Sequence, residues 1–206
     1  MGLLKEFDLF VFDWDGTIIR LYTHVRLYGR LIGSIVKREQ EVSFYDHDFE
    51  PPEETASKEN YIVSSVLNFF VEHFSKPHLN KYVIETLERL RHEDKKIGIL
   101  TNGSKDRVVK KMKKAGIEGY FDIVVSTKDL HAAKPNPAGL KVIIKALNVD
   151  SERCIYVGDK TGDILTAKYA KVRSCGIADG FDSYKRLKSV NPDYIFKSME
   201  GFYNAL

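Results

Sequence analysis

Short apolar runs alternate with helical patterns along most of this chain of 206 residues. The first run is Phe7–Phe12, and such a nearly continuous apolar run is typical of a parallel strand that is covered on both faces. Similar runs recur at Lys96–Leu100, Asp122–Val125, Cys154–Val157, Arg173–Ile177 and Tyr194–Phe196. Apolar residues at helical spacing occupy Val83–Arg91, Arg107–Ala115, Leu140–Leu147 and Ile164–Ala170. This order predicts the α/β class, with an open, Rossmann-like parallel sheet and helices on both of its faces.

One stretch, residues 21–76, breaks this alternation because it contains no strand–helix unit. Two helical patterns lie there, Thr23–Arg38 and Lys58–Phe74, and an acidic connector that contains prolines separates them. We therefore expect a small α-helical cap in this stretch, inserted after the first strand. The α/β core would then consist of residues 1–20 and 77–206.

Composition and charge exclude several kinds of partner. The chain has 32 Lys and Arg against 29 Asp and Glu, a formal net charge of +3, which gives no reason to expect nucleic-acid binding. No apolar run approaches the ~18 residues of a membrane span, and acidic residues interrupt any early signal sequence. The two cysteines, Cys154 and Cys175, suit a reducing compartment. We expect a cytoplasmic monomer or homodimer that binds neither nucleic acid nor membrane.

Polar and charged residues come after four of the predicted strands. In chain order they are Asp13 and Asp15, then Thr101, then Lys134, and then Asp159 and Asp163. Because ligands of an open parallel sheet bind beyond the carboxyl ends of its strands, we expect these side chains to meet at one edge.

The residue types at this edge indicate a chemistry. Carboxylates that lie close together repel one another and resist burial unless they share a cation. Mg²⁺ suits such a set, because it takes oxygen ligands from a few carboxylates, water and substrate phosphate. A threonine hydroxyl and a lysine ammonium suit phosphate oxygens instead, and a carboxylate can serve as the nucleophile toward phosphorus. The edge therefore predicts Mg²⁺ beside a phosphoryl group.

Four motifs carry a resemblance to a known family. They are Asp13-Trp14-Asp15-Gly16-Thr17, then Thr101 in Ile99-Leu100-Thr101-Asn102-Gly103, then Lys134-Pro135, and then Gly158-Asp159-Lys160-Thr161-Gly162-Asp163. In this order, each after its strand, they resemble the haloacid dehalogenase-like hydrolase superfamily, and within it the phosphoglycolate phosphatase-like branch with a helical cap. The resemblance covers roughly residues 7–20 and 79–197, and no motif falls in the expected cap.

The resemblance implies a catalytic role for several of these residues. Asp13 would attack phosphorus and become a phospho-aspartate. Asp15 would protonate the leaving oxygen and then take a proton from the attacking water. Thr101 and Lys134 would hold the phosphoryl oxygens, together with backbone N–H groups. The implied phosphate-binding set is Asp13, Trp14, Asp15, Thr101, Asn102 and Lys134.

The resemblance also implies a metal site and an activity. Mg²⁺ would bind the Asp13 carboxylate, the Asp15 backbone carbonyl and Asp159, with Asp163 as a ligand through water or as a residue that orients the site. The protein would be a Mg²⁺-dependent phosphatase that acts on a small phosphorylated metabolite. True dehalogenases lack the second carboxylate of the first motif, so the presence of Asp15 argues against dehalogenation.

Two alternatives remain open. In a phosphotransferase or phosphomutase, a sugar hydroxyl would replace water as the acceptor. A non-catalytic binding module is the other, although the intact set of Asp13, Asp15, Lys134 and Asp159 argues against it.

A basic stripe in the expected cap, Arg26, Arg30 and Lys37, falls within about 40° around a helix. Either this stripe, or Arg20 and Tyr22 just before it, meets an anionic part of the substrate, or the stripe is solvated and pairs with the acidic connector. Charge runs are usually solvated, so the second interpretation is favoured.

Overall fold

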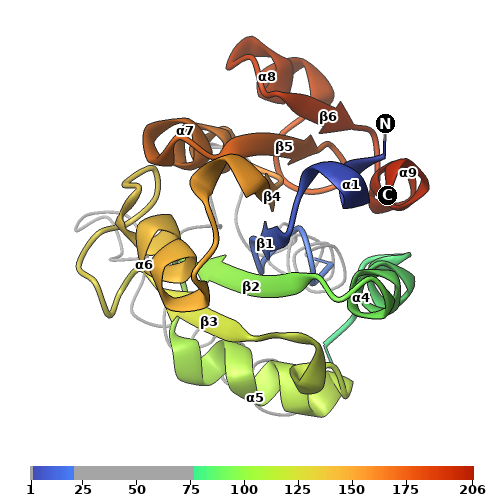
Figure 1. The fold of residues 1–206 in the computed structure, drawn as a ribbon, viewed down its shortest axis with the longest axis vertical. Coiled ribbons are helices and arrows are strands. Elements are labelled where there is room, and N and C mark those ends of the chain that lie inside the picture. The colour runs from blue at the N-terminus through green and yellow to red at the C-terminus, as the bar shows by residue number, and fades with distance from the viewer. Residues whose placement is uncertain (1, 21–76) are drawn as a thin grey trace, which may run out of the picture. The chain divides into compact units, whose positions relative to one another are not determined.

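The structure is a computed structural model that describes residues 2–20 and 77–206 (Figure 1). The contacts between residues divide the chain into two units. One is formed by Met1–Leu21 and Pro77–Leu206, and the other by Tyr22–Lys76. The expected helical cap and its basic stripe lie outside the described residues, so both stay predictions.

The centre of the described unit is one parallel sheet. Its strands are β1 (Leu9–Phe12), β2 (Lys96–Thr101), β3 (Ile123–Ser126), β4 (Cys154–Gly158), β5 (Arg173–Ile177) and β6 (Tyr194–Phe196). They lie in the order β3-β2-β1-β4-β5-β6, and every neighbouring pair is parallel (Figure 1). The apolar runs predict all six strands to within two residues at each end, and the predicted α/β class is confirmed.

Helices connect the strands. The α-helices of the described residues are α1 (Leu3–Glu6), α4 (Val83–His92), α5 (Lys105–Ala115), α6 (Ala138–Leu147), α7 (Thr161–Ala170), α8 (Tyr184–Ser189) and α9 (Met199–Ala205). Helical spacing predicts α4 to α7, although α5, α6 and α7 begin two or three residues earlier than expected. The other three are too short for a repeated period to stand out. None of the helices that the structure describes has the length and apolar character of a membrane span.

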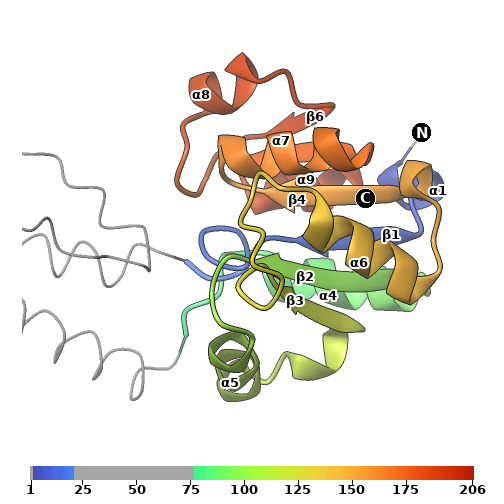
Figure 2. The ribbon, with the colours of Figure 1, turned by 90° about the vertical axis from the view of Figure 1, so that its left-hand side faces the viewer.

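Helices cover both faces of the sheet, as the two views in Figures 1 and 2 show. On one face, α4, α5 and α9 pack over a buried cluster that includes Phe10 and Phe202. On the other face, which is turned toward the viewer in Figure 2, α6 and α7 pack over a cluster that includes Val11 and Ile143. Successive residues of β1 thus enter opposite cores, which explains why this strand is apolar at every position.

The strand order contains a switch point between β1 and β4. The chain proceeds from β1 through β2 to β3 on one side, and then crosses to β4, β5 and β6 on the other side. The two strands are paired in parallel, with Phe12 opposite Val157, so their carboxyl ends lie together. A crevice at such a point is where open α/β sheets bind ligands. Asp13 follows β1 and Asp159 follows β4, so the fold brings the first and fourth motifs to this crevice.

Candidate active site

Asp13 continues the line of β1 into the crevice. Its backbone N–H donates to the carbonyl of Val157 at 2.9 Å, which extends the pairing with β4 by one residue. Its side chain is 6% exposed, and Lys134 Nζ donates to its Oδ1 at 2.5 Å. The first and third motifs, 121 residues apart in the chain, therefore meet in a buried ion pair.

Lys134 is held by two further acceptors. Its ammonium donates to Asp163 Oδ1 at 2.8 Å and to the hydroxyl of Tyr156 at 3.1 Å. The Tyr156 hydroxyl itself lies 2.9 Å from Asp163 Oδ1 and 3.4 Å from the carbonyl of Leu100. An ammonium has three N–H bonds, and the three acceptors Asp13, Asp163 and Tyr156 match that number. The position of Nζ is therefore fixed from three sides.

Three carboxylates gather at the crevice. Asp13, Asp159 and Asp163 are all buried, and each offers an oxygen within 4.8 Å of the others. Asp159 accepts from the Thr17 hydroxyl at 3.2 Å and from the backbone N–H of Phe181 at 2.6 Å. These donors are neutral, so Lys134 is the cation that the described residues place in hydrogen-bond contact with the triad.

The charges of this cluster do not balance. Burial and nearby carboxylates raise the pKa of Asp13 to about 6, although the charge of Lys134 opposes that shift. Burial, with Asp13 and Asp163, raises the pKa of Asp159 well above its usual range. Burial also disfavours the charged form of Lys134, but Asp13 and Asp163 outweigh it and raise the lysine pKa well above its usual value. A divalent cation would supply the missing positive charge, and an all-oxygen donor set fits Mg²⁺.

Asp163 satisfies both of its oxygens within the protein. Oδ1 accepts from Lys134 and lies in reach of the Tyr156 hydroxyl, and Oδ2 accepts from the backbone N–H of Lys160 at 3.0 Å. Among the residues that the structure describes, Asp159 Oδ1 has in contrast a single, longer hydrogen bond, from the Thr17 hydroxyl at 3.2 Å. Of these two residues, Asp159 is the one with an oxygen available to a metal, and Asp163 is suited to orient Lys134.

The side chain of Asp15 turns to a different partner. Arg107 of α5 donates from Nη2 to Asp15 Oδ2 at 2.6 Å and from Nη1 to Oδ1 at 3.4 Å. A Cβ atom at Gly103 would collide with this guanidinium, so glycine at that position makes room for it. The sequence offers no motif for Arg107, whose signal is only an arginine in the first turn after the Thr101 loop. The role of the Asp15 backbone carbonyl in a metal site stays a prediction.

The Thr101 loop connects the second and third motifs. Thr101 is buried, and its Oγ1 accepts from the backbone N–H of Gly103 at 2.9 Å. The side-chain oxygen of Asn102 accepts from the Thr127 hydroxyl at 2.9 Å and from the backbone N–H of Lys134 at 3.1 Å. These bonds give Asn102 a side-chain role that the sequence did not indicate. The expected contacts of Thr101 and Asn102 with phosphate stay predictions.

Trp14 lies between the two carboxylates of the first motif in the chain, and its ring is fully buried in the core cluster. Its indole N–H has no hydrogen-bond partner among the described residues. This placement agrees with a packing role for the ring. The expected phosphate contact of its backbone N–H stays a prediction.

Asn80, which comes after residues 21–76 in the chain, fixes the loop of the first motif. Its side-chain N–H groups donate to the carbonyls of Gly16 and Thr17, each at 2.8 Å. Gly16 has φ of 97°, and a Cβ atom there would collide with the carboxylate of Asp159. Glycine is therefore required for the loop to approach Asp159 so closely. Nothing in the sequence pattern singled out Asn80.

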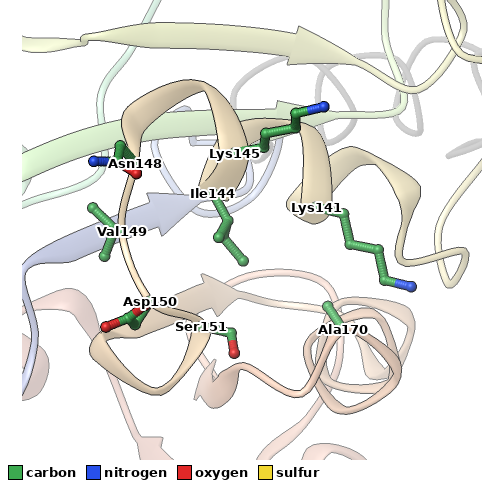
Figure 3. A pocket seen from close by; sticks show the side chains of 8 residues that line it. All are labelled: Lys141, Ile144, Lys145, Asn148, Val149, Asp150, Ser151 and Ala170. Carbon is green, nitrogen blue, oxygen red and sulfur yellow. The ribbon is translucent and has the colours of Figure 1, made fainter.

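One open pocket lies away from this edge of the sheet (Figure 3). It measures about 540 Å³ and is lined by α6, the loop to β4 and the last residue of α7, with Lys141, Lys145 and Ser151 among its residues. That loop enters the amino end of β4, whereas the carboxylates follow its carboxyl end. No motif residue lines the pocket, so it contributes nothing to the site.

Comparison with known proteins places the chain in a family. A family model described as haloacid dehalogenase-like hydrolase matches residues 10–177. A curated relative, Pyrophosphatase PpaX of Halalkalibacterium halodurans, is 32% identical over 117 residues, which are 57% of this chain and 54% of that protein. In that relative the match thus spans about half of its length. Pyrophosphatase PpaX of Listeria monocytogenes serotype 4a is 25% identical over 201 residues, which are 92% of this chain and 91% of that protein.

A solved structure shares the fold. It is described as a predicted phosphoglycolate phosphatase from Haemophilus somnus 129PT, and it aligns with a TM-score of 0.75 at 20% identity. The alignment covers 94% of this chain and 95% of that one. The family resemblance drawn from the four motifs is confirmed, because the family model matches most of the chain. This chain belongs to the haloacid dehalogenase-like hydrolase family.

Proposed function

We propose that this protein is a phosphatase that hydrolyses a small phosphorylated metabolite, a phosphate monoester, through a phospho-aspartate at Asp13. The observation that carries the proposal is the contact of Asp13 with Lys134 beside Asp159 and Asp163. Transfer of a phosphoryl group to a carboxylate requires a nucleophilic carboxylate and positive charge beside the phosphoryl oxygens. Asp13, the fixed ammonium of Lys134 and a buried carboxylate set that suits a divalent cation match these requirements. The names of the curated relatives, pyrophosphatases, support a phosphoryl substrate.

The first half of the reaction uses Asp13 and Asp15. An oxygen of ionised Asp13 attacks phosphorus, and the bond from phosphorus to the leaving oxygen breaks with its electron pair. Asp15 donates a proton to that oxygen, so the product leaves as an alcohol. Lys134 favours the ionised form of Asp13 by its charge, and it would donate to a phosphoryl oxygen in place of one of its three present acceptors.

The second half restores the carboxylate. A water molecule attacks phosphorus of the phospho-aspartate while Asp15 takes a proton from it. The bond between phosphorus and the Asp13 oxygen breaks, and inorganic phosphate forms. Thr101 and the backbone N–H groups of Trp14, Asp15 and Asn102 hold the phosphoryl oxygens in both halves.

Mg²⁺ is the cofactor that we propose for this site. The carboxylates of Asp13 and Asp159 would hold it, with the backbone carbonyl of Asp15, while Asp163 would act through Lys134 or a water. When bound, the ion would neutralise negative charge on the phosphoryl group and orient it. The buried oxygen set and the raised pKa of Asp159 support this assignment.

An aryl phosphate assay tests the proposal. Turnover of p-nitrophenyl phosphate should require Mg²⁺ and stop when a chelator is added. Asp13→Asn should lower kcat by about 10³-fold or more, because the amide is a poor nucleophile. Asp8→Asn is the matched control, since Asp8 comes just before the other end of β1 and should leave kcat within about twofold.

Activity that persists in Asp13→Asn would contradict the proposed nucleophile. Phosphorylation of an added sugar, in place of phosphate release, would favour the phosphotransferase alternative with Asp13 in the same role. A cytoplasmic location and a monomeric or homodimeric state stay predictions.

A further inference from the structure

Arg107 and Asp15 form an ion pair that the reaction described above does not use. Both oxygens of the Asp15 carboxylate contact the guanidinium, at 2.6 and 3.4 Å, and the two side chains are 12% and 19% exposed. Gly103 provides the space for this guanidinium, as a Cβ atom there would overlap it. The guanidinium of Arg107 thus lies between Gly103 of the Thr101 loop and the Asp15 carboxylate.

The pair lies on the side of the leaving group. In an in-line displacement, the nucleophile and the leaving oxygen are on opposite sides of phosphorus. Asp13 is on the entering side, so Asp15, which protonates the leaving oxygen, faces the other side. Arg107 contacts Asp15 directly and therefore lies next to whatever is attached to the leaving oxygen.

We propose that Arg107 recognises a second oxyanion of the substrate, a phosphate or carboxylate group attached close to the leaving oxygen. This inference rests on the proposed function, because it takes Asp15 as the residue that faces the leaving group. A guanidinium suits this task, since its planar fork binds carboxylate or phosphate oxygens in pairs. The substrate oxyanion takes up the N–H groups that Asp15 occupies in this structure.

The charges at the site support the same assignment. Lys134 already has three acceptors in Asp13, Asp163 and Tyr156. A second negative charge on the leaving side needs a separate cation, and Arg107 is the one that the described residues bring into contact with Asp15. The substrates that fit are small molecules with two oxyanions, of which inorganic pyrophosphate and 2-phosphoglycolate are simple examples. Phenyl phosphate has the transferred group alone.

Substrate discrimination provides the test. With Mg²⁺ present, kcat and KM are measured for pyrophosphate, 2-phosphoglycolate and phenyl phosphate. Arg107→Gln should lower kcat/KM for the substrates with a second oxyanion about 10- to 100-fold more than for phenyl phosphate, mainly through KM. Arg107→Lys should restore part of the loss, because it keeps the charge and loses the fork. A larger loss with pyrophosphate identifies the second group as a phosphate, and a larger loss with 2-phosphoglycolate identifies it as a carboxylate.

Lys110→Gln is the matched control, because it removes one positive charge from an exposed position of the same helix. It should leave the ratio of the kcat/KM values unchanged. Equal losses in Arg107→Gln for all three substrates would overturn the inference, since Arg107 would then act only through Asp15. If Arg107→Gln leaves the ratio of the kcat/KM values unchanged, the inference is overturned too. Hydrolysis of phenyl phosphate by the same protein would still support the proposed function.

A binding measurement separates this inference from the proposed function. If the protein hydrolyses none of the three substrates, the proposed function fails and calorimetry still decides the role of Arg107. In the Asp13→Asn background with Mg²⁺, adding Arg107→Gln should weaken pyrophosphate binding at least about tenfold and orthophosphate binding less. Equal affinities for pyrophosphate with and without Arg107 would overturn the inference.

Discussion

Tyr156 connects the third and fourth motifs at the level of single atoms. Its ring is fully buried, and its hydroxyl lies between Lys134 Nζ, at 3.1 Å, and Asp163 Oδ1, at 2.9 Å. Burial, with the nearby charge of Asp163, raises the pKa of Tyr156 well above its usual value, so the hydroxyl keeps its proton. The neutral Tyr156 hydroxyl, which both donates and accepts, therefore limits how far Lys134 can move when a phosphoryl group enters.

Removing this hydroxyl should reduce activity. We expect Tyr156→Phe to lower kcat about 5- to 20-fold, because Lys134 loses one of its three acceptors, and to cost about 1–2 kcal/mol of unfolding free energy. Tyr194→Phe is the matched control, since the Tyr194 hydroxyl also bonds a carboxylate, that of Glu6 at 2.8 Å, but from β6. Aryl phosphate kinetics and urea denaturation of both variants measure the two effects. Equal kcat values in the two variants would show that Tyr156 has no part in positioning Lys134.

At the level of elements, the sequence predicts the framework well because the central strands β1, β2 and β4 are buried on both faces. Such strands leave short, continuous apolar runs, and the site carboxylates follow them directly. Asp163 lies both in the fourth motif and in the first turn of α7. Its carboxylate accepts from the backbone N–H of Lys160, just before α7, and from Lys134.

Other contributors to the site could not be found in the sequence. Tyr156 is one apolar position of a buried strand, so nothing distinguishes it from core residues. Arg107 is one of many basic residues on α5, and its partner Asp15 is 92 residues away. Asn80 reaches Gly16 over 64 residues of chain. These contacts depend on which distant segments of the chain meet in the fold. Periodicity and motif spacing do not encode that.

For the whole molecule, the carboxylate cluster links stability to pH and to metal. Asp13 ionises at an ordinary pKa of 3.8 when unfolded and at about 6 in the fold. The folded state therefore binds more protons between these values, so this group lowers stability as pH rises through that range. Asp159 acts in the same direction. A divalent cation at the cluster removes this cost, and its binding competes with protons.

Mg²⁺ should therefore raise the melting temperature more at about pH 7.5 than at about pH 5. The rise should be roughly 5–10 °C at about pH 7.5 when Mg²⁺ is about 100-fold above its Kd. Thermal unfolding with and without Mg²⁺ at the two pH values measures this. Asp159→Asn should melt higher than the wild type at about pH 7.5 without metal and should lose the response to Mg²⁺. An equal Mg²⁺ effect at both pH values would contradict the proposed ligands.

The fold assembles distant segments around Asp13, and we propose that this carboxylate accepts a phosphoryl group during turnover. The most direct measurement is an acid quench during turnover, followed by mass spectrometry of the peptide that contains Asp13. We expect a fraction of that peptide to carry one phosphoryl group on Asp13, sensitive to hydroxylamine and absent when Mg²⁺ is chelated. Turnover with no label on any residue, or with the label on a residue other than Asp13, would show that Asp13 is not the nucleophile.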